Sequence, residues 1–190
     1  MTPRFVLVGG GVRSGKSTFA LRAARRLGSR RTLVATAQPL DDEMRERIAA
    51  HRRERGAEFD TVEEPLDVPG ALDRLATGPA TPDVVVVDCL TLWLSNLLLR
   101  GDDAPALECA VGRLAAAIAR RPFHVVVVTN EVGLGVVPPS PLGRTFRDIA
   151  GRSHQRLAPF ADHLYFAALG CILRLKPGPL CLVVDEGDLP

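Results

Sequence analysis

One segment near the N-terminus restricts the fold of this chain more than any other. It consists of Gly10, Gly11, Val12, Arg13, Ser14, Gly15, Lys16 and Ser17, and it fits the pattern G-x-x-x-x-G-K-[ST] in full. The apolar run Phe5 to Val8 precedes it, and apolar residues at helical spacing follow it as far as Leu27. A buried strand, a glycine-rich turn and a helix in this order predict a phosphate-binding loop. Glycines there let backbone N–H groups converge on phosphate oxygens, and the helix N-terminus adds partial positive charge.

The residue types in and after this loop suggest specific roles. Lys16 is expected to bridge the outer phosphates of a nucleoside triphosphate, and Ser17 to hold Mg²⁺ through its hydroxyl. Asp88 ends the apolar run Val84 to Val87, so its carboxylate can hold Mg²⁺ through water or polarise an acceptor hydroxyl. A simpler reading of Asp88 is a cap for the helix that follows. Asn130 and Glu131 end another such run and have a weaker claim on the same crevice.

Strand and helix patterns alternate along the chain. The two valine-rich runs, 84–87 and 124–129, are continuously apolar, which is typical of strands buried on both faces of a parallel sheet. Further strands are expected at 32–36, 163–169 and 173–175, with helices at 16–27, 41–55, 90–99, 106–120 and 144–157 and a proline-rich loop at 136–141. The pattern predicts an α/β fold with a mostly parallel sheet flanked by helices. The 190 residues suit one domain, expected to span 1–176, with a peripheral tail at 177–190.

Composition excludes several classes of function. Twenty-four Lys and Arg against 22 Asp and Glu give a net charge of +2, which favours neither nucleic acid nor an anionic membrane as partner. No apolar run approaches the roughly 20 residues that membrane insertion requires. The N-terminus has no signal-peptide pattern, and the 4 cysteines are scattered with no CxxC pair. We therefore expect a cytoplasmic protein with reduced thiols and no zinc site.

The expected helix 41–55 carries a histidine of interest. Arg47 lies one turn before His51 on the same face of this helix. A neutral imidazole beside a triphosphate can attack the α-phosphorus and displace pyrophosphate, leaving a phosphoramidate. Spacing alone nevertheless favours a surface histidine on a solvated helix. The other histidines, at 124, 154 and 163, are expected to be structural or solvent-facing.

Beyond the phosphate loop, several segments occur in an order that resembles a known family, the bifunctional adenosylcobinamide kinase/adenosylcobinamide-phosphate guanylyltransferases of cobalamin biosynthesis. The resemblance extends over residues 5 to about 176, and its most specific parts are Thr-Asn-Glu-Val-Gly-x-Gly at 129–135 and Phe-Arg-Asp-x-Ala-Gly at 146–151. The other matching segments are the loop at 10–17, Ala-Thr-Ala at 35–37, Asp-Asp-Glu-Met at 41–44, Arg-Ile-x-x-His at 47–51, Thr-x-Glu-x-Pro at 61–65 and Val-Asp-Cys-Leu-Thr-Leu-Trp-Leu-Ser-Asn-Leu at 87–97.

This resemblance implies a RecA-like P-loop fold, a homotrimer and two consecutive reactions on one corrinoid. In the first, ATP or GTP phosphorylates adenosylcobinamide. In the second, GTP transfers GMP through a guanylylated histidine, which falls on His51, to the new phosphate. The implied nucleotide contacts are the loop 10–17, Ala35, Thr36, Ala37, Arg52, Arg53, Glu54, Arg55, Glu63 and Asp88, with Mg²⁺ on Ser17 and Asp88. One departure is His154, because the family usually has asparagine there.

Three alternatives remain open from the residues. A small-molecule P-loop kinase would lack the covalent step. A non-catalytic GTP switch needs an Asn-Lys-x-Asp motif, to which Thr129 to Val132 is the nearest approach. A RecA-like nucleic-acid motor is disfavoured by the near-neutral charge and the short chain.

Overall fold

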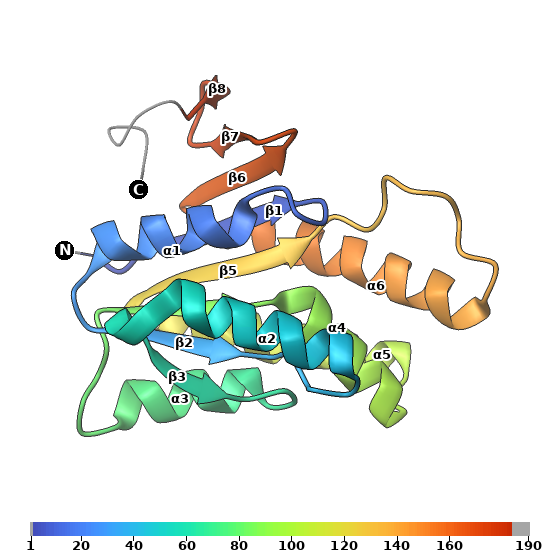
Figure 1. Ribbon diagram of the computed structural model, residues 1–190, viewed down its shortest axis with the longest axis horizontal. Coiled ribbons are helices and arrows are strands. Elements are labelled where there is room, and N and C mark those ends of the chain that lie inside the picture. The colour runs from blue at the N-terminus through green and yellow to red at the C-terminus, as the bar shows by residue number, and fades with distance from the viewer. Residues whose placement is uncertain (1, 184–190) are drawn as a thin grey trace.

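The computed structural model describes residues 2–183, apart from the side chains of residues 47, 54 and 55, and shows a sheet flanked by helices (Figure 1). The strands are β1 (Phe5–Gly10), β2 (Arg31–Ala35), β3 (Asp60–Glu63), β4 (Val84–Asp88), β5 (His124–Asn130), β6 (His163–Ala168), β7 (Cys171–Lys176) and β8 (Cys181–Leu182). The helices are α1 (Lys16–Leu27), α2 (Asp42–Arg55), α3 (Val68–Thr77), α4 (Leu90–Arg100), α5 (Ala104–Arg120) and α6 (Pro141–Leu157), with short 3-10 turns at Gly56–Glu58 and Ala158–Phe160.

The strands form an 8-stranded sheet in the order β3-β2-β4-β5-β1-β6-β7-β8. The first six strands in this order pair in parallel, and β7 and β8 are antiparallel additions at one edge. The prediction of a mostly parallel α/β sheet is therefore confirmed. Because β1, β2, β4 and β5 run in the same direction, the loops that follow them meet at one edge of the sheet.

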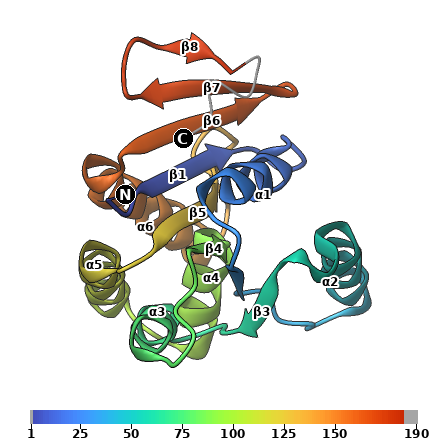
Figure 2. The same cartoon turned by 90° about the vertical axis from the view of Figure 1, so that its left-hand side faces the viewer.

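The valine-rich strands form the middle of the core, as their sequence predicts. Val84 and Val86 pack on the α1 side of the sheet, and Val85 and Val87 pack on the side covered by α3, α4, α5 and α6. All four side chains are at most 1% exposed. Figure 2 shows the sheet between α1 on one side and these four helices on the other.

Several elements differ from the sequence-based expectation. Strand β3 and helix α3 were not predicted. Most of β3 is exposed at the sheet edge, so it has no apolar run that could have predicted it. Helix α3 does have local sequence signals: the side chain of Asp67 accepts from Gly70 N, and Pro69 lies in the first turn. Helix α6 begins at Pro141 instead of Arg144, because Ser140 caps it by accepting from Gly143 N at 3.1 Å. The expected loop 136–141 therefore ends one residue earlier.

The expected tail contributes one short strand. In β8, Leu182 pairs with Leu173 and Cys181 with Arg174, so this part of the chain extends the sheet beyond β7. Residues 184–190 of the expected tail lie outside the described residues. Within the described chain, no helix combines the length and apolarity needed to cross a membrane.

Helix α2 differs from the other helices because none of its described side chains is buried. Its N-terminus is capped by Asp41, whose carboxylate accepts from Met44 N at 2.7 Å, and Asp42 and Glu43 complement the helix dipole in the first turn. This confirms the expected exposed helix. Since none of its described side chains belongs to the core, its inner face is available to line a cavity.

Candidate nucleotide-binding site

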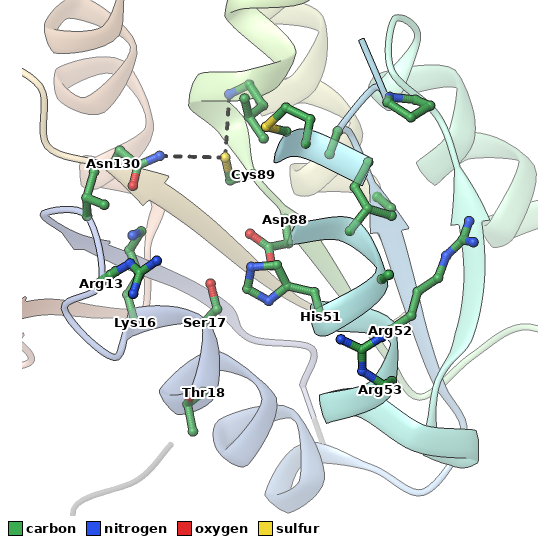
Figure 3. A pocket seen from close by; sticks show the side chains of 18 of the residues that line it. Arg13, Lys16, Ser17, Thr18, His51, Arg52, Arg53, Asp88, Cys89 and Asn130 are labelled. Atoms are coloured by element: carbon green, nitrogen blue, oxygen red, sulfur yellow. Dashed lines mark hydrogen bonds between the residues drawn. The ribbon is translucent and has the colours of Figure 1, made fainter. Parts of the chain in front are cut away.

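A cavity of about 920 Å³ opens at the carboxyl edge of the sheet, between the glycine-rich loop and α2 (Figure 3). Its other walls come from the ends of β2, β3, β4 and β5 and from the start of α4. Its lining residues are Val12, Arg13, Ser14, Gly15, Lys16, Ser17, Thr18, Ala35, Ala37, Pro39, Met44, Arg45, Ile48, Ala49, His51, Arg52, Arg53, Glu63, Asp88, Cys89, Leu92 and Asn130. The volume falls in the range of small-molecule sites.

The glycine-rich loop has the conformation that phosphate binding needs. Gly15 precedes α1 in the left-handed region, with φ of 88°, which favours glycine. A Cβ on Gly10 would lie 2.5 Å from the carbonyl oxygen of Ala167 on the neighbouring strand β6, so only glycine fits at this position of β1. The first turn of α1 contains no acidic residue, which leaves its positive end available to an anion. Lys16 is buried, and its ammonium donates to Gly11 O at 3.0 Å.

The end of β2 forms the facing wall. Ala35 and Ala37 line the cavity, whereas the Thr36 side chain is fully buried and its hydroxyl bonds to the backbone of Cys89. Asn96 on α4 donates to Thr36 O at 2.7 Å and to Pro65 O at 3.0 Å. Thr36 therefore stabilises the wall and does not line the cavity.

Helix α2 presents one face to the cavity. Met44, Ile48 and His51 recur at helical spacing along this face. In Figure 3, the side chains of His51, Asp88 and Ser17 point toward the same part of the cavity. Arg52 forms an ion pair with Glu63 of β3, which connects α2 to the sheet edge. The structure thus brings His51 and the phosphate loop to one cavity.

A polar cluster occupies the start of α4 and the end of β5. Thr91 Oγ1 lies 3.3 Å from Cys89 Sγ and accepts from Asn130 Nδ2 at 2.9 Å and from Asn130 N at 3.3 Å. Burial, together with the charge of Asp88, raises the pKa of the Cys89 thiol to about 11. The thiol is therefore protonated at neutral pH and is unsuited to act as a nucleophile.

Most residues expected to contact nucleotide line this cavity, but not all. Gly10, Gly11 and Thr36 are not among the described lining residues, and the side chains of Glu54 and Arg55 lie outside the described part of the structure. Several lining residues were not predicted as nucleotide contacts from the sequence, namely Thr18, Pro39, Met44, Arg45, Ile48, Ala49, Cys89 and Leu92. The four-residue spacing of Met44 and Ile48, with His51 on the same face, was a signal that could have found part of this set.

The residues present fit a magnesium ion shared with a nucleotide. Ser17 and Asp88 offer a hydroxyl and a carboxylate to the same cavity, and Mg²⁺ prefers such oxygen donors. Among the described residues, no group of three or more His, Cys, Asp or Glu is placed to hold a metal ion. In phosphoryl-transfer sites, Mg²⁺ is usually held by a few protein oxygens together with phosphate oxygens of the substrate.

The fold and this cavity define a P-loop nucleotide-binding protein of the α/β class. The RadB recombinase crystal structure has a similar fold, with a TM-score of 0.51 and 16% identity over 94% of this chain and 86% of that one, which identifies the sheet as RecA-like. Residues 6–175 match the family model described as cobinamide kinase / cobinamide phosphate guanyltransferase, and the chain belongs to this family.

The names of two similar proteins agree with this family assignment. The chain is 42% identical to the bifunctional adenosylcobalamin biosynthesis protein CobP of Pseudomonas aeruginosa over 174 residues, covering 92% of this chain and 98% of CobP. It is 41% identical to the bifunctional adenosylcobalamin biosynthesis protein CobU of Escherichia coli over 184 residues, covering 90% of this chain and 99% of CobU. The family resemblance expected from the sequence motifs is therefore confirmed.

Proposed function

We propose that this protein catalyses two consecutive reactions of cobalamin biosynthesis. It phosphorylates adenosylcobinamide with ATP or GTP, and it then transfers GMP from GTP to adenosylcobinamide-phosphate, giving adenosylcobinamide-GDP and pyrophosphate. The observation that most supports the second reaction is that His51 and the phosphate loop line one cavity. A nucleophile and a triphosphate cradle in one cavity meet the proximity requirement of covalent nucleotidyl transfer.

In the proposed guanylyl transfer, a ring nitrogen of neutral His51 attacks the α-phosphorus of GTP. A nitrogen–phosphorus bond forms, the bond from the α-phosphorus to the bridging oxygen breaks, and pyrophosphate leaves. A phosphate oxygen of adenosylcobinamide-phosphate then attacks the same phosphorus and releases the histidine. The chain contributes position and charge, which account for most catalysis of phosphoryl-type transfers.

The cavity wall supplies the positive charge that this chemistry needs. Lys16 on the loop would contact the β- and γ-phosphates, which become the leaving pyrophosphate, and Arg13, Arg45 and Arg53 also line the cavity. Ser17 and Asp88 would hold Mg²⁺, which supplies further positive charge to the outer phosphates when bound. Glu63, which is paired with Arg52, also lines the cavity and is a proposed nucleotide contact.

Other parts of the proposal rest on the family resemblance. We propose a homotrimer located in the cytoplasm, a small-molecule corrinoid and nucleotides as its ligands, and no nucleic-acid partner.

The decisive experiment is labelling with α-³²P-GTP in the presence of Mg²⁺, followed by peptide mapping. We expect acid-labile, base-stable label on the peptide that contains His51, and none on His51→Ala. His163→Asn is the matched control, because His163 opens β6 and is not among the residues that line the cavity. Equal labelling of the His51→Ala protein would disprove the assignment.

The labelling also separates the proposal from a kinase without a covalent step. Such a kinase would phosphorylate cobinamide and leave the protein unlabelled in every variant. Turnover of cobinamide itself would in turn exclude both a GTP switch and a nucleic-acid motor.

A further inference from the structure

We propose that Asn130 is a positioning residue for the kinase reaction: its side-chain carbonyl oxygen accepts a hydrogen bond from the substrate hydroxyl that is to be phosphorylated. This inference rests on the proposed function and names the residue that orients the acceptor in its first step. Asn130 ends β5 and lines the cavity.

The amide group of Asn130 is held by neighbours that the guanylyl-transfer chemistry does not use. Its Nδ2 donates to Thr91 Oγ1 at 2.9 Å and lies 3.9 Å from Cys89 Sγ. Its backbone N–H donates to the same hydroxyl at 3.3 Å. Thr91 is 3% exposed and Cys89 is 4% exposed, so both partners belong to the protein interior. The amide hydrogens of Asn130 therefore face the protein.

With the amide nitrogen of Asn130 held by the protein, the side-chain carbonyl oxygen of Asn130 faces the cavity. In Figure 3, the amide nitrogen of Asn130 is turned toward Cys89, and its oxygen is turned toward the loop that carries Arg13 and Lys16. Residues Gly10 and Asn130 are register partners of β1 and β5, and Glu131 N donates to Gly10 O at 3.0 Å. The oxygen thus lies beside the phosphate loop, where Lys16 is expected to hold the outer phosphates.

An amide oxygen is only an acceptor of hydrogen bonds, and this decides which group it can orient. It attracts a hydroxyl, which donates, and repels phosphate oxygens, which only accept. In the kinase reaction, a hydroxyl receives the transferred phosphoryl group, whereas in the guanylyl transfer a phosphate receives the GMP. Asn130 therefore serves the first reaction and not the second.

In the proposed step, the substrate hydroxyl donates a hydrogen bond to Asn130 Oδ1. This bond orients the hydroxyl so that a lone pair of its own oxygen points at the γ-phosphorus. The oxygen–phosphorus bond forms while the bond from the γ-phosphorus to the bridging oxygen breaks, and the nucleoside diphosphate leaves. The hydroxyl proton passes to an oxygen of the transferred phosphoryl group and from there to water. Asn130 itself neither gains nor loses a proton.

The test is Asn130→Ala, assayed for corrinoid phosphorylation and for hydrolysis of the nucleotide in the same samples. We expect kcat for phosphorylation to fall by roughly 10-fold or more, with little change in KM for the nucleotide. Because water can replace a poorly oriented hydroxyl, the ratio of hydrolysed to transferred phosphate should rise severalfold. Labelling of His51 by GTP should stay within about twofold of the unchanged protein, which also shows that the variant is folded.

A pair of variants at Thr91 tests whether the held amide is responsible. Thr91→Val removes the oxygen that accepts from Asn130, and we expect it to raise the hydrolysed fraction as Asn130→Ala does. Thr91→Ser keeps that oxygen and should leave the ratio unchanged. This result would not follow if Asn130 only stabilised the fold.

Two outcomes would overturn the inference. An unchanged ratio of hydrolysis to transfer in Asn130→Ala would show that the residue does not orient the hydroxyl. A parallel loss of phosphorylation and His51 labelling, with a raised requirement for Mg²⁺, would assign Asn130 to the metal hydration shell instead. Failure of the unchanged protein to label His51 would contradict the proposed guanylyl transfer but not this assignment, so the two failures are distinguishable.

Discussion

Thr36 and Cys89 exchange two hydrogen bonds across β2 and β4. The Thr36 hydroxyl donates to the carbonyl oxygen of Cys89 at 2.9 Å and accepts from its N–H at 2.7 Å. Both residues are buried, and Cys89 begins the turn into α4 directly after Asp88. One side chain therefore fixes the ends of two neighbouring strands relative to each other, and with them two walls of the cavity.

We predict that Thr36→Val lowers the free energy of unfolding by about 1–3 kcal/mol, because the buried N–H of Cys89 loses its acceptor while the side-chain volume is nearly kept. The carbonyl oxygen of Cys89 loses one donor but still accepts from Trp93 N at 3.1 Å. Urea denaturation measures the change. Thr77→Val is the matched control, since Thr77 is exposed at the end of α3 and should change stability by no more than about 0.5 kcal/mol. A Thr36→Val protein as stable as the control would contradict the bracing role of the hydroxyl.

Lys16→Ala should impair both reactions, since one loop is proposed to hold the outer phosphates in each. We expect losses on the order of 100-fold in corrinoid phosphorylation and in His51 labelling, because a charge aimed at the reacting phosphates is removed from a buried position. Lys176→Ala is the control: this lysine donates to Pro159 O and is not among the residues that line the cavity. If either reaction survived Lys16→Ala at full rate, the two would not share this loop.

Glu63→Gln should weaken GTP binding without unfolding the protein. The Arg52–Glu63 ion pair is more than half exposed on both side chains, at 56% and 63%, so it contributes at most about 0.5 kcal/mol to stability. Both residues line the cavity, and Glu63 is a proposed nucleotide contact. The loss of its carboxylate should therefore appear as a raised KM for GTP in the labelling reaction.

Glu58→Gln provides the comparison for that variant, because the Arg25–Glu58 pair is similarly exposed but not among the residues that line the cavity. Its KM for GTP should equal that of the unchanged protein. Equal KM values for the two variants would remove Glu63 from the nucleotide site.

His154 should make stability depend on pH. Its Nε2 lies 2.8 Å from Thr129 Oγ1, and burial lowers the pKa of His154 from the usual 6.5, although Glu131 nearby opposes this. The unfolded chain then takes up a proton at higher pH than the folded one. The contribution of His154 to stability is therefore complete above pH 6.5 and declines as the pH falls through that value and below it.

His154→Asn removes this titration and keeps a polar side chain at the position. Urea denaturation at about pH 7.5 and 5.5 should show a larger loss of stability on acidification for the unchanged protein than for the variant. His124 and His163, whose pKa values burial also lowers, are common to both proteins and cancel in the comparison. Equal losses would mean that His154 titrates alike in the folded and unfolded chain.

Local patterns predicted those elements whose structure depends on neighbouring residues or on complete burial. The valine runs of β4 and β5 indicated strands inside the sheet, and the helix expected at 41–55 corresponds to the exposed helix α2. Strand β3 escaped detection because an exposed edge strand has no need of apolar residues on either face. Its Glu63 was expected at the nucleotide site only through the family resemblance.

The sequence by itself determined the phosphate loop, because the conformation of eight consecutive residues between a strand and a helix follows from their own glycines, lysine and serine. What lies opposite that loop was decided by the tertiary structure. The sheet places β4 and β5 between β2 and β1, and α2 follows β2, so the distance from His51 to Lys16 depends on strand order and not on their separation in the chain. The same pairing of distant strands brings Asn130 beside Gly10 and Thr36 beside Cys89, contacts for which no local pattern exists.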